Sequence, residues 1–163
     1  MHPEAPSIFL ALEQSSLGAE IRQSAWIYAA ANVGHIMGLV IFAGALAVMD
    51  LRLLGAFGRT PPLQVIIPAR RVAAAAFLAQ LATGALLFIA DASHIAVNPL
   101  FQTKLVLITL GLANALILGR LTDSDLAEIP CGVRLPARLR VAAVLSLCFW
   151  MAVAVSGRLI AYF

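Results

Sequence analysis

Charged residues are scarce in this chain of 163 residues, where they make up 12% of the sequence. In soluble domains, charged residues make up roughly a quarter of the sequence. Hydrophobic residues, by contrast, make up 62%. The sequence also lacks the alternating segments of about ten residues that typify membrane β-barrels. These absences exclude an ordinary soluble protein and a barrel, and they indicate an integral membrane protein built from helices.

Cysteine and histidine are also rare, with two and three residues respectively. Cys131 and Cys148 form no CxxC pair, and neither a zinc-binding nor a c-type haem attachment spacing occurs. Residues 1–23 contain glutamates in place of the basic start and the cleavage site of a signal peptide. We therefore expect the first apolar stretch to insert as its own anchor.

Four apolar stretches are each long enough to cross a hydrocarbon core about 30 Å thick, which takes about 20 helical residues. We predict an all-α, integral membrane four-helix bundle that forms one domain over residues 1–163. The spans are expected at about 24–50, 70–91, 102–120 and 139–161.

The positive charges predict the orientation of this bundle. Eight of the eleven basic residues lie in or beside the connections between spans one and two and between spans three and four. Those connections are expected to face the cytoplasm, which puts both termini on the periplasmic side. The net charge of +3 is thus a topology signal and gives no reason to expect nucleic acid as a partner.

The segments outside the spans give weaker signals. Residues 1–23 are expected to form a periplasmic interfacial helix capped at Ser7. Pro68, together with prolines 61 and 62, is predicted to break the helix and keep the first connection short. Asp50 and Arg52 are expected at the headgroup level, where Gly55 would close the first helix. Residues 92–102 are predicted to be a loop.

His35 lies in the middle of the first span, one helical turn from Asn32 and Gly38. An ionisable ring is costly to hold in hydrocarbon, so its position predicts a functional site. Gly34 and Gly38 form a Gly-x-x-x-Gly step that permits close approach of another helix, including one from a second copy or a partner subunit. Such a step also leaves room for a flat ligand beside His35.

Polar residues on the other spans extend this site. Gln80 and His35 each lie roughly 15 Å below the outer surface, counted at ~1.5 Å per residue. Neutral imidazole is the usual ligand of haem b, and a four-helix bundle is the usual place to hold it. We therefore predict a cofactor site in which His35 is the axial ligand, and in which Lys104 and Arg158 bind anionic groups such as propionates.

The second axial ligand is open at this point. His94 is the candidate, although it lies roughly 15 Å nearer the surface than His35 by the same rise per residue. A tilted haem, a five-coordinate haem and a ligand from another subunit are the three possibilities. Asn32, Gly38 and Gln80 would complete the cofactor site.

Three other interpretations are kept. Copper would be bound by His35 and His94 with soft ligands drawn from Met37, Met49, Met151 and Cys148. A quinone or proton site would pair His35 with Gln80. A non-catalytic assembly subunit would use its small residues to bind partner helices. No nucleophile and base that could act together are recognisable, and no broken helix pair indicates a transporter.

Several runs along the spans carry a resemblance. They are Trp26-Ile27-Tyr28, His35, Gly38, Asp50-Leu51-Arg52-Leu53-Leu54-Gly55, Gly84-Ala85-Leu86-Leu87-Phe88, Asn98-Pro99-Leu100-Phe101 and Lys104. Together they resemble a family of small bacterial four-helix inner-membrane proteins of unknown function. More distantly, the histidine of the first span and the lysine of the third are similar to those of copper-resistance CopD proteins and b-type cytochrome bundles. The resemblance implies a redox or metal role for His35.

The leading hypothesis is therefore a small redox subunit of the bacterial inner membrane. It would bind haem b at His35 and pass electrons to or from a quinone or a periplasmic redox protein.

Overall fold

The computed structural model describes residues 6–127, 129–160 and 162, with the backbone alone at 120–125. Four of its helices are long and apolar enough to cross a membrane: α3 (Ala25–Leu54), α4 (Pro62–Ala90), α6 (Pro99–Ala127) and α7 (Ala137–Leu159). Three shorter helices are α1 (Ser7–Glu13), α2 (Ser16–Gln23) and α5 (Ala92–Val97). The prediction of an all-α, multi-pass membrane protein is confirmed.

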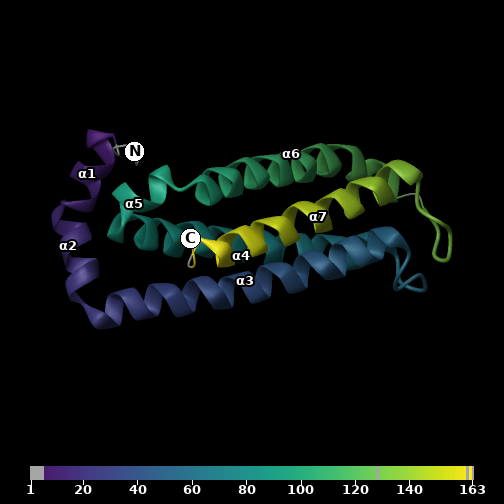
Figure 1. Cartoon of the computed structure of the whole chain (residues 1–163). Helices are drawn as coiled ribbons and strands as arrows, with labels where there is room; N and C mark the ends of the chain where they lie inside the picture. Colours follow the sequence, from purple (N-terminus) through teal and green to yellow (C-terminus); the bar gives the residue numbers. More distant parts are fainter. Residues whose placement is uncertain (1–5, 128, 161, 163) are drawn as a thin grey trace.

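The four long helices lie side by side, while α1 and α2 lie across one end of the bundle with α5 beside them (Figure 1). We call this the capped end. The opposite end, with the α3–α4 and α6–α7 connections, is the loop end. Helix α3 packs along both α4 and α7, and α6 packs along α7. Helices α4 and α6 approach each other much more sparsely.

Several helix boundaries follow from local chemistry. Ser15 and Ser24 cap the starts of α2 and α3, and each hydroxyl accepts a hydrogen bond from the backbone N–H three residues later. Gly55 ends α3 with φ +116°, a conformation that glycine adopts without strain. This confirms the predicted role of Gly55. Ser7 is the first helical residue of α1 rather than its cap, and the turn before Ser15 divides the predicted interfacial helix into two.

The helices reach further at the loop end than hydropathy predicts. Helix α4 begins at Pro62, where the missing N–H of a first-turn proline costs nothing, and it continues through Pro68. The predicted break at Pro68 is wrong, because membrane helices tolerate the loss of one backbone hydrogen bond. The predicted loop over 92–102 is also wrong in part, since it contains α5.

The main apolar core occupies the half of the bundle near the loop end, where α3 residues from Phe42 to Leu53 pack against the other three long helices. Asp50 and Arg52 are buried in the same half rather than lying exposed at the headgroup level. Arg52 Nη2 donates a 2.9 Å hydrogen bond to the Thr60 carbonyl and so ties the end of α3 to its connection with α4.

Candidate functional site

His35 is held by a hydrogen bond and by a close backbone contact with α4. Its Nδ1 lies 3.1 Å from the Thr83 hydroxyl oxygen. The Thr83 hydroxyl donates its own proton to the Ala79 carbonyl at 2.8 Å. The threonine oxygen therefore accepts a hydrogen bond from His35 Nδ1, which leaves the lone pair on Nε2 for another partner.

The ring of His35 fits against α4 because residue 84 is glycine. A Cβ at Gly84 would lie 3.2 Å from His35 Cε1, which is tighter than an ordinary van der Waals contact. The missing side chain thus makes the space for the imidazole. His35 is half-buried.

Gln80 and Lys104 complete what we call the His35 site, which consists of His35, Gln80, Thr83 and Lys104. Gln80 lies one turn before Thr83 and its Nε2 is buried without a hydrogen-bond partner among the described residues. The Lys104 ammonium on α6 lies near Gly157 of α7, 3.2 Å from where a Cβ would stand.

The predicted Gly-x-x-x-Gly step, Gly34 and Gly38, packs against another helix of the same chain. A Cβ at Gly34 would lie 3.3 Å from Thr83 Cγ2, and one at Gly38 would lie 3.0 Å from Gln80 Cγ. Helix α4 therefore occupies the step that the sequence offered to a partner helix or a flat ligand. Close packing of α3 and α4 is what brings Gln80 and Thr83 to His35.

Three aromatic rings separate the His35 site from the loop-end half of the bundle. Phe42 and Trp150 lie 4.6 Å apart between ring centroids, and Phe77 lies 5.7 Å from each of them. Trp150 is seated against Gly111 of α6, where a Cβ would lie 3.1 Å from the indole. This aromatic layer closes the His35 site on the side away from the capped end.

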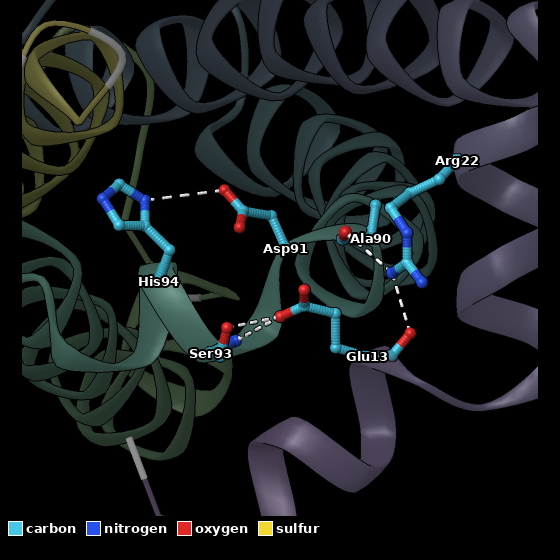
Figure 2. A network of polar contacts seen from close by, with 6 residues as sticks. All are labelled: Glu13, Arg22, Ala90, Asp91, Ser93 and His94. Atoms are coloured by element: carbon cyan, nitrogen blue, oxygen red, sulfur yellow. Dashed lines mark hydrogen bonds and ion pairs between the residues drawn. The ribbon is translucent and has the colours of Figure 1, made fainter. Parts of the chain in front are cut away.

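The capped end carries a polar network that involves α1, α2, α4 and α5 (Figure 2). A carboxylate oxygen of Glu13 accepts hydrogen bonds from the Ser93 backbone N–H at 2.9 Å and the Ser93 hydroxyl at 2.6 Å. Arg22 donates to the carbonyls of Glu13 and Ala90 at 2.7 and 3.2 Å. The hydrogen bonds from Ser93, helped by the charge of Arg22, hold the pKa of Glu13 below its ordinary value of 4.5.

Aromatic stacking adds to this attachment. Phe9 of α1 meets Phe88 of α4 edge to face with 6.0 Å between centroids, and Phe88 stacks on Phe101 of α6 at 5.3 Å. Helices α1 and α2 are thus fastened to the bundle by both polar and apolar contacts. We call residues 7–23 the cap.

The other predicted site residues, His94, Arg158 and Asn32, are exposed. His94 belongs to the network of Figure 2, where its Nδ1 is 3.5 Å from the Asp91 carboxylate and its side chain is 73% exposed. Arg158 is exposed and donates to the Tyr162 hydroxyl at 2.6 Å. Asn32 is exposed on α3. Of the predicted residues, Gln80 packs on Gly38, one turn from His35, while Lys104 packs against Gly157.

This arrangement fits a haem through one ligand only. His35 Nε2 has the free lone pair that an axial ligand needs, and the Thr83 hydrogen bond would orient it. His94 pairs with Asp91 instead of facing His35. The spaces left by Gly38 and Gly84 are filled by Gln80 and His35 themselves. We therefore derive no chemistry through a bis-histidine haem.

Copper ligands do not gather either. Among the described residues, no group of three or more His, Cys, Asp or Glu side chains comes together. The thioethers of Met37 and Met151 and the thiol of Cys148 face outward. The His35 site instead presents nitrogen groups that suit an oxygen-bearing ligand.

Two contributions escaped the sequence reasoning. In the sequence Thr83 is one small polar residue of the second span among several, and its contact with His35 depends on the rotation of α4 about its axis. Gly157 gave no signal, because its role is to make room for a lysine from another helix.

Fold and site together define a multi-pass membrane protein of four apolar helices with a polar site on one side of an aromatic layer. The chain belongs to the family of unknown function DUF6644, which matches residues 8–163. This match confirms the resemblance to an uncharacterised family, whereas the likeness to CopD proteins and cytochromes has no match behind it. No curated protein and no solved structure matches the chain.

Proposed function

We propose that this protein is a redox subunit of the bacterial inner membrane that binds the head group of a quinone at the His35 site. The observation that carries the proposal is the buried Gln80 amide, whose Nε2 has no hydrogen-bond partner among the described residues and which lies one turn from Thr83, the partner of His35. A buried donor without a partner costs free energy, and a ligand oxygen would remove that cost.

The groups of this site suit both redox states of a quinone. Gln80 Nε2 and Lys104 Nζ donate hydrogen bonds, which a quinone carbonyl oxygen accepts. His35 Nε2 accepts one, which a quinol hydroxyl can donate. An imidazole also exchanges protons near neutral pH, as quinone reduction and quinol oxidation require. Electrons would come from, or go to, a second membrane or periplasmic redox protein.

The distribution of arginines supports an orientation for this subunit. The capped end would face the periplasm, because the arginines gather in and beside the two connections of the loop end. Both termini would then lie on the periplasmic side, and the His35 site would lie in the outer half of the bilayer.

Quinone binding to the purified protein in nanodiscs tests the proposal. Trp26→Phe leaves Trp150 as the sole tryptophan, and a short-chain ubiquinone analogue would quench its fluorescence. We expect Gln80→Leu, Lys104→Met and His35→Leu each to weaken binding by about tenfold, the effect of one lost hydrogen bond of ~1.4 kcal/mol.

Matched substitutions control for the general effect of a polar-to-apolar change. Gln64 on α4 and His94 on α5 are exposed, so Gln64→Leu and His94→Leu should bind the analogue as the parent does. Quenching of equal strength in all variants would mean that the analogue is merely dissolved in the lipid, and the proposal would be wrong.

A further inference from the structure

One carboxyl group of the bundle is buried without a partner. Asp50 of α3 has no exposed surface, and neither of its side-chain oxygens has a hydrogen-bond partner among the described residues. An ionised carboxylate normally accepts several hydrogen bonds, since each oxygen offers two lone pairs. The surroundings of Asp50 therefore decide in which protonation state the fold can hold it.

Asp50 lies in the apolar core between α3 and α7. Leu46 and Leu53, four residues before and three residues after it, share its face of α3, and both are buried. Helix α7 packs along α3 and buries Ala143 and Ser146. The Ser146 hydroxyl faces the carboxyl of Asp50 without meeting hydrogen-bond geometry. The carboxyl is thus held in an apolar environment with one hydroxyl beside it.

No described cation neutralises this carboxyl. Arg52 stands two residues further along α3, on another side of the helix, and donates to a carbonyl of the α3–α4 connection. On the neighbouring helices, Arg70 of α4 and Arg138 and Arg140 of α7 form no ion pair with it. An ionised carboxylate at this position would be a buried charge without a counter-ion, which is strongly unfavourable inside a membrane protein.

We propose that Asp50 is a proton-binding site, at which the folded protein holds a proton on the carboxyl and releases it to water only when α3 and α7 separate at the loop end. A protonated carboxyl is neutral, and its O–H can donate to the Ser146 hydroxyl after a rotation of either side chain. A metal cation fits less well. Calcium, for example, takes about six or more oxygen ligands, whereas the described side chains offer one carboxyl and one hydroxyl.

The position of Asp50 links its proton to one end of the bundle. Asp50 lies four positions before Leu54, the last residue of α3, which is about 6 Å along the helix. His35 lies fifteen positions away in the other direction, about 22 Å along the helix and beyond the aromatic layer. Asp50 therefore exchanges its proton with water at the loop end, and this site does not depend on quinone binding at the His35 site.

Infrared difference spectra between variants test the proposal directly. The C=O stretch of a protonated carboxyl is resolved from the bands of carboxylates and amides, and it shifts in D2O. The parent spectrum minus that of Asp50→Asn should contain this band at neutral pH. Asp91→Asn is the matched control, because the Asp91 side chain is 54% exposed and paired with His94. Its difference spectrum should contain carboxylate bands, and the same bands for Asp50 would overturn the proposal.

Two serines of α7 keep the test decisive if Asp50→Asn fails to fold. Ser146→Ala removes the hydroxyl beside Asp50 and should shift the protonated-carboxyl band of the parent. Ser156→Ala is its control, since Ser156 is also buried but donates to the Ala152 carbonyl. It should leave the band in place. A parent without the band, or a band that responds equally to both substitutions, would contradict the proposal.

The same proton should appear in the stability of the protein. Unfolding exposes Asp50 to water, where a carboxyl group is ionised above pH about 5. The unfolding constant of the parent, measured by SDS titration and divided by that of Asp50→Asn, should rise about tenfold per pH unit between pH about 5 and 7. Asp91→Asn should keep this slope. A ratio that does not change with pH would mean that folding binds no proton at Asp50, and quinone binding at the His35 site would be unaffected, so the two proposals fail separately.

Discussion

The imidazole of His35 lies against the backbone of Gly84, with Cε1 3.2 Å from the position that a Cβ would take. Gly84→Ala should therefore displace the ring and weaken its hydrogen bond to Thr83. We expect quinone affinity to fall by about tenfold, since misplacing one group of a binding site costs roughly one hydrogen bond. The fluorescence titration described for the His35 site measures this change.

The free energy of unfolding of Gly84→Ala distinguishes a displaced His35 ring from general destabilisation by overpacking. Alanine gains about 1 kcal/mol over glycine in a helix, which offsets part of the 1–3 kcal/mol that overpacking costs, so the net loss of stability should be about 2 kcal/mol or less. Gly44→Ala on α3 is the matched control, because no neighbour lies within 4 Å of its Cβ position. If Gly44→Ala weakened quinone binding as much as Gly84→Ala does, the contact with His35 would not be the cause.

The haem hypothesis has its own test. Protein isolated from cells supplied with haem is examined by visible absorption, oxidised and then reduced with dithionite, beside His35→Ala and His94→Ala. Any reducible haem spectrum should disappear in His35→Ala and persist in His94→Ala, because His94 is exposed and paired with Asp91. A spectrum that His94→Ala abolishes would show that His94 rearranges to become the second ligand.

Arg52 should contribute to stability far more than its exposed neighbour Arg59. It is 2% exposed and donates to the Thr60 carbonyl. Arg52→Met should lower the free energy of unfolding by about 2 kcal/mol, the typical value of a hydrogen bond from a charged donor. Arg59→Met should change it by about 0.5 kcal/mol or less. Denaturation in detergent compares the two, and equal losses would argue against the Arg52 anchor.

The attachment of the cap should depend on pH through Glu13. Because the pKa of Glu13 is lowered in the folded protein, its contribution is complete above the ordinary value of 4.5 and is lost as the pH falls through the lowered value. Amide hydrogen exchange in α1 and α2, corrected for the intrinsic rate, should therefore rise between neutral pH and pH about 3.

Glu13→Gln removes the titration and provides the control. Its exchange in α1 and α2 should already be raised at neutral pH and should change little on acidification. Asp91 and His94 are the other titratable groups of this network. A parent-like pH dependence in Glu13→Gln would assign the effect to one of them instead.

The spans were predictable because hydrocarbon imposes a length and a composition that the sequence displays directly. The helix extensions at the loop end were not predictable. Residues 62–69, for example, precede the apolar stretch, which begins at about residue 70. Their helical state depends on packing against the rest of the bundle. The burial of Asp50 and Arg52 was missed for the same reason. Hydropathy assigns them to the headgroup level, whereas contacts among the four helices bury them.

The depth of the His35 site in the bundle was predictable from the sequence. The rotation of α3 and α4 about their axes was not. Counting the helical rise placed His35 and Gln80 at one level, and α4 does bring Gln80 beside Gly38. The contact of His35 with Thr83 required the facing angle of α3 and α4, which no single helix specifies. Asp91 and His94 stand three residues apart, a spacing that brings side chains together on a helix, but α5 itself was not predicted.

The cap, pinned by Glu13 and Arg22, lies across the end of the bundle nearest to the His35 site. A ligand of that site would then enter laterally, from the hydrocarbon core of the bilayer. Its occupancy would follow the mole fraction dissolved in lipid rather than the aqueous concentration, and adding empty vesicles at constant total ligand would dilute it away. Water-soluble analogues would reach the same groups only in proportion to their partitioning.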